Sequence, residues 1–125
     1  MTIANIIDRF VNVSQTTNST QATGLIWTPP GSSVSNIEAI ITAVKPSDGT
    51  SASWRITALY KTVSGTVSLV GSVLDLMTAQ KDTAAITWAT TIDISGSNVR
   101  VRVTGGLTDT IQWMIELRTQ VYIYA

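Results

Sequence analysis

The sequence of 125 residues contains no cysteine and no histidine, and its charged residues are few. Without the first two residue types, the chain cannot form a Ser-His-Asp triad, a Cys-His dyad, a zinc finger or a disulfide framework. Charged residues make up 13% of the chain, about half of the ~25% that is usual for soluble domains. We therefore expect no enzymatic activity and no bound cofactor.

The charges that are present balance, with eight Lys and Arg against eight Asp and Glu. A nucleic-acid-binding domain needs a basic patch that releases counterions from phosphates, so this balance argues against such a partner. No apolar run approaches the ~20 residues that a membrane-spanning helix needs. Residues 1–10 also lack the basic and apolar regions of a signal peptide. We expect neither nucleic acid nor a membrane as a partner.

Hydroxyl-bearing and β-branched residues are abundant: 20 Thr, 13 Ser, 14 Ile and 12 Val. Branched side chains crowd a helix but fit the pleated surface of a sheet. At ~100–200 residues per domain, the length allows one domain with its own core. The composition predicts a single all-β domain with a structural or binding role.

Alternation of apolar and polar residues marks the predicted strands, most clearly toward the C-terminus. Residues 98–104 and 109–124 alternate with period two, as half-buried strands do. The glycines of Gly105–Thr108 between them predict a hairpin turn that uses positive φ. Apolar residues on both faces of 36–45 predict a strand that is covered on both sides. Weaker alternation predicts further strands at 22–28, 53–61, 66–77 and 85–95.

About eight strands, separated by Gly and Pro turns and without a convincing helix, predict an antiparallel, jelly-roll-like β-sandwich. We expect this domain to span residues 21–125. Residues 1–20 are an arm or a first strand, and the polar stretch 14–23 is a loop or an extended arm. The predicted core contains Trp54, Trp88, Val101, Trp113 and Ile115.

Apolar residues near the N-terminus are candidates for contact with a partner. Ile3, Ile6, Ile7 and Phe10 belong either to a first strand of the domain's own sheet or to an arm that docks on a shell or a neighbour. Trp27 precedes a Pro-Pro-Gly turn, where an aromatic ring at a sheet rim can stack on a sugar or anchor a protein partner.

The outward face of the two C-terminal strands is a candidate subunit interface. Its charged residues pair either across neighbouring strands of one chain or between subunits. The same face carries a methionine and two tyrosines, which make it less polar than a free surface. The candidate interface residues are Arg100, Arg102, Met114, Glu116, Arg118, Tyr122 and Tyr124.

The eight carboxylates are spread along the chain, and no two are adjacent. A glycosidase needs two carboxyl groups held close together in a cleft, and nothing in the spacing indicates such a pair. We therefore name no catalytic and no metal-binding residue. A calcium site built in loops from Asp48, Asp82 or Asp109 stays an alternative without a motif behind it.

Five short segments, in their order and spacing, resemble a module of tailed-phage virion proteins. This module recurs at the ends of phage tail fibres and in small capsid-associated proteins. The likeness spans residues 51–124. The matching segments are WRITA at 54–58, SLVGS at 68–72, the Trp- and Asp-containing strand at 88–95, VRVRVTG at 99–105 and TIQW at 110–113.

The resemblance implies a β-sandwich that trimerises on a virion surface and has no catalytic residues. Because the chain is one domain without a fibre shaft, we expect a stand-alone capsid decoration (cement) protein. Its partners would be copies of itself and the major capsid protein or another virion protein. The alternative is a tail-fibre or receptor-binding tip that recognises a host-surface glycan.

Overall fold

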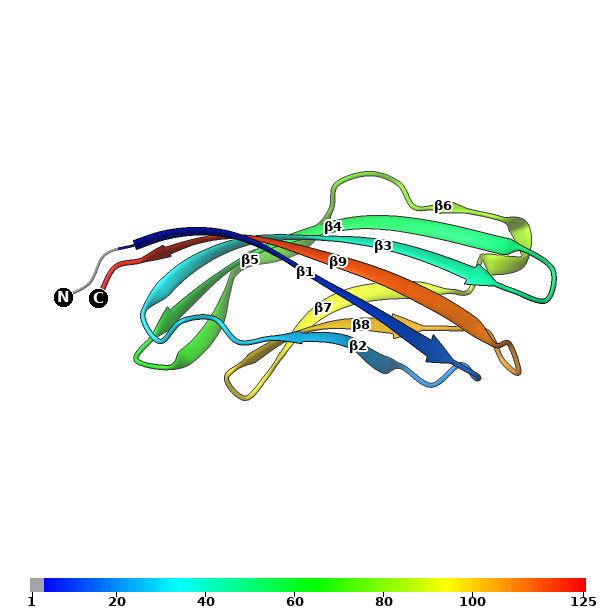
Figure 1. Cartoon of the computed structure of the whole chain (residues 1–125), viewed down its shortest axis with the longest axis horizontal. Coiled ribbons are helices and arrows are strands. Elements are labelled where there is room, and N and C mark those ends of the chain that lie inside the picture. The colour runs from blue at the N-terminus through cyan, green and yellow to red at the C-terminus, as the bar shows by residue number, and fades with distance from the viewer. Residues whose placement is uncertain (1–3) are drawn as a thin grey trace.

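Two antiparallel sheets of unequal size face each other in the computed structural model, which describes residues 4–125 (Figure 1). The all-β sandwich expected from the sequence is confirmed, with nine strands where about eight were expected. The helical content of the described part is a single 3-10 turn, Thr83–Ala85. The strands are β1 (Ala4–Thr16), β2 (Ala22–Trp27), β3 (Ser33–Lys45), β4 (Thr50–Val63), β5 (Thr66–Asp75), β6 (Gln80–Lys81), β7 (Ala89–Ser95), β8 (Asn98–Thr104) and β9 (Ile111–Ile123).

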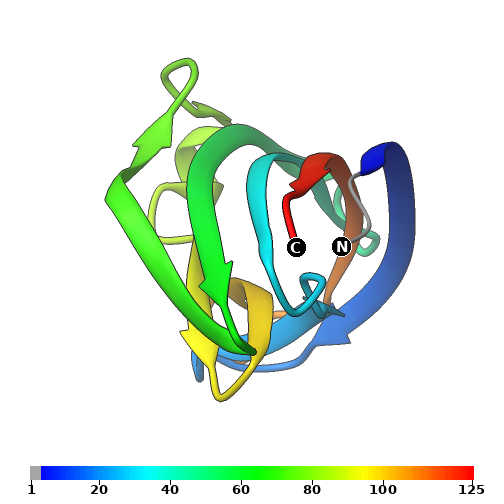
Figure 2. The same ribbon diagram turned by 90° about the vertical axis from the view of Figure 1, so that its left-hand side faces the viewer.

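The large sheet has the strand order β1-β9-β3-β4-β5, and the short β6 also pairs with β4. The small sheet has the order β2-β8-β7. Viewed from one end, the large sheet curls over the small one (Figure 2). We call the end where the chain begins and finishes the terminal end. The opposite end, where β3 turns into β4 and β8 leads into β9, is the loop end.

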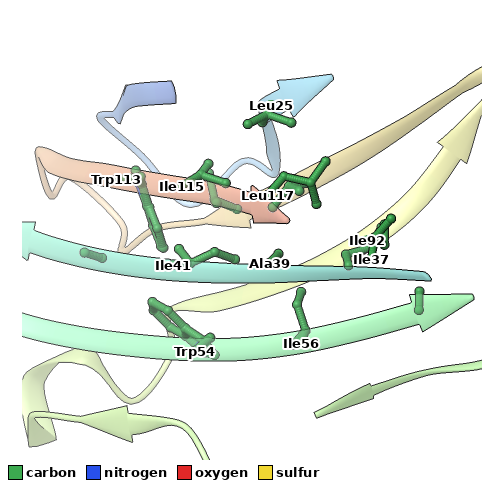
Figure 3. Close-up of a cluster of buried hydrophobic side chains, with 14 of the residues drawn as sticks. Leu25, Ile37, Ala39, Ile41, Trp54, Ile56, Ile92, Trp113, Ile115 and Leu117 are labelled. Atoms are coloured by element: carbon green, nitrogen blue, oxygen red, sulfur yellow. The ribbon is translucent and has the colours of Figure 1, made fainter. Parts of the chain in front are cut away.

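The core lies between the sheets and is made by the inward positions of the alternating strands. All five residues predicted for it are buried: Trp54, Trp88, Val101, Trp113 and Ile115. Three of these are tryptophans that pack on one another near the loop end. The Trp54 and Trp113 rings stack at 5.5 Å, and Trp88 lies 6.1 Å from Trp113. Figure 3 shows Trp54 and Trp113 of the large sheet together with aliphatic side chains from both sheets.

The predicted hairpin between residues 98–104 and 109–124 is wrong, because β8 and β9 belong to different sheets. The connection crosses from the small sheet to the large one, and its glycines serve close packing. A Cβ at Gly105 would lie 2.7 Å from Thr16 Oγ1, and one at Gly106 would lie 2.1 Å from Asp109 Oδ2. The positive φ in this segment belongs to Thr108, at 65°.

The predicted strands 85–95 and 66–77 are not regular over their whole length. The strand expected from residue 85 begins at Ala89, because the chain first makes the 3-10 turn and leaves Ile86 72% exposed. In β5, Gly71 takes a φ of 77°, and the pairing with β4 shifts register beside it. This irregularity bends the strand without ending it, as a β-bulge does.

The expectation that residues 36–45 are covered on both sides is wrong. The inward side chains of β3 are buried, whereas its outward side faces solvent. Ile40 is half-buried there because β4 and β9, on either side of β3, place Arg55 and Glu116 directly beside it. Long neighbouring side chains thus replace a third layer.

Strand β1, residues Ala4–Thr16, pairs along its whole length with β9 and forms one edge of the large sheet. It includes residues 14–16, which the sequence suggested as loop or arm. Ile3 lies outside the described residues. Asp8 is on the same side of β1 as Ile6 and Phe10, and a charge on the inner side of an edge strand discourages pairing with another edge.

Candidate functional site

The outer face of the large sheet gathers four of the seven candidate interface residues. Met114, Glu116, Arg118 and Tyr122 occupy alternate positions of β9 and point away from the core. Tyr124 follows β9, and its hydroxyl donates a hydrogen bond to the Thr62 carbonyl at 3.1 Å. These residues therefore share one surface, as the alternation predicted.

Arg100 and Arg102 lie elsewhere, on the outer face of the small sheet. Arg100 donates two hydrogen bonds to Asp93, at 2.8 and 2.9 Å, and Arg102 reaches the same carboxylate at 3.4 Å. The bond from Asp93 also raises the pKa of Arg100. The predicted pairing of these arginines with Glu116 is wrong, because β8 pairs with β7 and not with β9.

A chain of alternating charges crosses four neighbouring strands of the large sheet. Glu116 of β9 pairs with Arg9 of β1 and, at 2.7 Å, with Arg118. Glu38 of β3 lies 3.9 Å from Arg118 and 2.6 Å from Arg55 of β4. We call these five residues the charge ladder. The hydrogen bond from Arg9, followed by that from Arg118, lowers the pKa of Glu116.

The sequence reading missed Arg9, Glu38 and Arg55 as members of this surface. All three occupy outward positions of strands, which the alternation of 36–45 and 53–61 does show for Glu38 and Arg55. The order of strands in the sheet was the missing information. A single sequence does not reveal that β9 lies between β1 and β3.

Two hollows adjoin on the outer face near the terminal end. The larger has a volume of about 560 Å³ and the smaller about 380 Å³, and both are lined by Ile7, Asn36 and Gln120. We call the two together the furrow. Its floor follows β9 and β3, with Ile7 of β1 on one side and Leu59 of β4 on the other.

The floor of the furrow is polar in its middle. Asn36 and Gln120 are exposed and lie directly opposite each other across β3 and β9. Neither amide forms a side-chain hydrogen bond with another residue of 4–125. Tyr122, with 46% of its surface exposed, lies at one end of the floor, and Arg118 and Glu38 lie at the other. The sequence analysis named neither Asn36 nor Gln120 as a candidate site residue.

The apolar residues near the N-terminus divide between surface and core. Ile7 is 84% exposed and Ile6 is 38% exposed. Phe10 is half-buried against the core, with its ring 6.4 Å from that of Trp27. Trp27 is also half-buried, so one part of its ring is already covered by its own chain.

The three aspartates considered for a calcium site are engaged by the protein itself. The ammonium group of Lys45 lies 3.6 Å from Asp48 and 3.2 Å from Asp109. Asp82 accepts a hydrogen bond from the Ser51 amide at 2.8 Å. No group of three or more metal-ligating side chains occurs within residues 4–125. The ammonium group of Lys45 thus lies where a bound cation would lie, between two carboxylates. The hydrogen bond to Asp109, followed by the charges of Asp109 and Asp48, raises the pKa of Lys45.

Within the part of the chain that is described, no helix has the length and apolar character required to cross a membrane.

No protein-family model matches the sequence, and no curated protein matches it. Among solved structures, the tailspike protein of Acinetobacter baumannii phage AM24 is similar over 94% of this chain, with 13% identity and a TM-score of 0.41. The tailspike protein of Acinetobacter phage vB_ApiP_P1 is similar over 92% of this chain, with 18% identity and a TM-score of 0.46. The similar regions make up 26% and 22% of those two proteins, so this chain spans about a quarter of either.

Proposed function

We propose that the protein is a structural component of a bacteriophage virion and that it decorates the capsid surface as a homotrimer. The segments that resemble the virion module, at 54–58, 68–72, 88–95, 99–105 and 110–113, fall in or beside β4, β5, β7, β8 and β9. They therefore belong to the paired strands of both sheets, where a shared fold would place them.

The observation that carries this proposal is the loop-end half of the large sheet's outer face. Val13 is 61% exposed and Met114 is 53% exposed, and the two are directly opposite each other across β1 and β9. The charge ladder borders them through Glu116. Apolar side chains that leave water, next to charges that can pair across a boundary, are what a subunit contact needs. Arg100 and Arg102 lie on the outer face of the small sheet and are not part of this patch.

We also propose that the protein has no enzymatic activity. A general acid or base has to exchange a proton near neutral pH. Glu116, held by two arginines, has its pKa lowered and is unsuited to that task. The carboxylates that pair with Lys or Arg are Glu38, Asp48, Asp93, Asp109 and Glu116.

Copy number in purified virions tests the decoration role. Quantitative gel densitometry against the major capsid protein should give a ratio of the same order for this chain. A few copies per particle would contradict the proposal. Light scattering of the purified protein should give three times 13.4 kDa, and Met114→Arg should lower that mass if the proposed face is the contact.

A second candidate is a tail-fibre or receptor-binding tip that recognises a host-surface glycan. The furrow favours it, because the Asn36 and Gln120 amides on its floor form no side-chain hydrogen bond within residues 4–125 and are open to a ligand. The low copy number that would contradict decoration is the result expected for a tip.

A further inference from the structure

We propose that the furrow binds a neutral carbohydrate, a short oligosaccharide that lies along β9 and β3. This inference goes beyond a scaffolding role and holds whether the protein is on the shell or the tail. It also deepens the second candidate function, since it names the site and the class of glycan.

The amides of the floor supply the hydrogen bonds that a sugar requires. Each amide of Asn36 and Gln120 offers two donors and an acceptor, and a sugar hydroxyl both donates and accepts. Because neither side chain is bonded within residues 4–125, both amides are free to exchange water for a ligand. The pair lies side by side across one strand boundary, so adjacent hydroxyls of one ring can reach both.

The ends and walls of the furrow supply apolar contact. Tyr122 presents a ring whose negative face attracts the polarised C–H groups of a sugar. Ile7 and Leu59 border the floor on either side and would flank the chain of sugar rings. From Tyr122 to Arg118 the floor is ~13 Å long at about 3.3 Å per residue, which suits a short linear ligand.

The charges at the far end indicate a neutral ligand. Arg118 lies 2.7 Å from Glu116 and 3.9 Å from Glu38, and these two carboxylates also pair with Arg9 and Arg55, so every guanidinium of the charge ladder already has a carboxylate partner. An acidic sugar would meet those carboxylates as well as the cation. A neutral sugar can accept from the arginine and donate to Glu38 without that repulsion.

Two other readings of the surface fit less well. A second copy of the chain would bury the amides of Asn36 and Gln120, and each buried amide without a hydrogen-bond partner would weaken the contact. Trp27, the residue considered first for a sugar, already packs on Phe10. The furrow offers both an exposed aromatic ring and unpaired polar groups, whereas Trp27 offers part of a ring.

A glycan array probed with the labelled full chain tests the proposal, followed by calorimetric titration of the best neutral oligosaccharide. Tyr122→Ala should weaken binding by about tenfold, since an aromatic contact of this kind is worth up to that factor. Asn36→Ala should also weaken it. Ile26→Ala is the control, because Ile26 is a 59% exposed residue of β2 in the small sheet, outside both the furrow and the proposed subunit contact.

Tyr122→Phe keeps the ring and should retain most of the affinity, which separates stacking from a loss of folding. Three results would overturn the proposal: an array without a bound neutral glycan, binding that Tyr122→Ala leaves unchanged, or loss of binding only with Trp27→Ala. A fall in mass by light scattering with Tyr122→Ala would assign the furrow to a subunit contact instead. None of these results alters the copy number in virions, so the virion proposal is tested separately.

Discussion

The two ends of the sandwich share the same long strands, β1, β9, β3 and β4, yet their interiors differ. At the loop end the inward positions hold stacked tryptophans, with Trp113 at the centre. At the terminal end the buried inward positions include four small hydroxyl residues. These are Ser33, Ser35, Thr62 and Thr119.

The difference follows from what closes each end. Two facing sheets lie ~10 Å apart, and large rings fill that space at the loop end. At the terminal end the turn after β4 meets the segment before β3, where the Gly65 amide donates to the Gly31 carbonyl at 2.8 Å. The Tyr60 ring is also buried at this end, directly beside Ser35, and the remaining buried positions there hold short side chains. Two buried threonines also differ: the Thr16 hydroxyl accepts a hydrogen bond from Trp113 Nε1, whereas the Thr62 hydroxyl has no hydrogen-bond partner within residues 4–125.

Removing the central ring should have the largest effect. Trp113→Ala is expected to lower the free energy of unfolding by about 3–5 kcal/mol, because it opens a cavity among buried rings and strands the Thr16 hydroxyl. Urea denaturation measures this. Trp27→Ala removes a half-buried ring and should lower the free energy of unfolding clearly less. Equal losses in the two variants would contradict the larger contribution that we assign to the loop-end tryptophans.

A methyl group added between the two sheets tests how closely β2 packs against β9 in the middle of the sandwich. A Cβ at Gly24 would lie 2.2 Å from Ile115 Cδ1, so Gly24→Ala should cost about 1–3 kcal/mol by overpacking. Gly31→Ala is the control, since a Cβ there meets nothing within 4 Å. If both variants unfold at the same urea concentration, the close packing of Gly24 against Ile115 is contradicted.

The same substitution at the two ends should have opposite signs. Thr16→Val removes the acceptor that Trp113 Nε1 uses at 2.8 Å and should cost about 1–3 kcal/mol. Thr62→Val removes a buried hydroxyl that has no hydrogen-bond partner among residues 4–125, and it should leave stability unchanged or raise it by up to about 1 kcal/mol. Thermal or urea unfolding of both variants measures the difference. A loss at Thr62 as large as that at Thr16 would mean that the hydroxyl is satisfied in solution, for example by a buried water.

A pH dependence at the terminal end is expected only at alkaline pH and is absent near neutrality. Burial, with a further contribution from Asp93, raises the pKa of Tyr60 to about 12 from its ordinary value of 10.0. The neutral phenol is therefore favoured in the folded state. Its contribution to stability is complete below pH 10 and is lost as the pH rises toward 12. Unfolding of the wild-type chain and Tyr60→Phe should diverge only in this alkaline range, and parallel curves there would contradict the assignment.

Some of this architecture was readable from local pattern. The alternation of 109–124 predicted which side of β9 faces the core, and the five predicted core residues are buried. Local pattern failed where chain neighbours separate in space. Residues 98–104 and 109–124 read as a hairpin, but the step between the sheets depends on how Gly105 and Gly106 pack against other segments. The misplaced Arg100 and Arg102 followed from that one error.

The sequence by itself determined that the chain is all-β, that it has no histidine or cysteine for a catalytic or metal centre, and which side of each clear strand is apolar. These properties depend on composition and on a period of two, which are local. Only the tertiary structure decided the strand order, and with it the charge ladder and the furrow. Arg9, Glu38 and Arg55 meet β9 because residues far apart in the chain become neighbours in one sheet. Asn36 faces Gln120 for the same reason: long-range strand pairing is fixed by the packing of the whole core, which no single strand encodes.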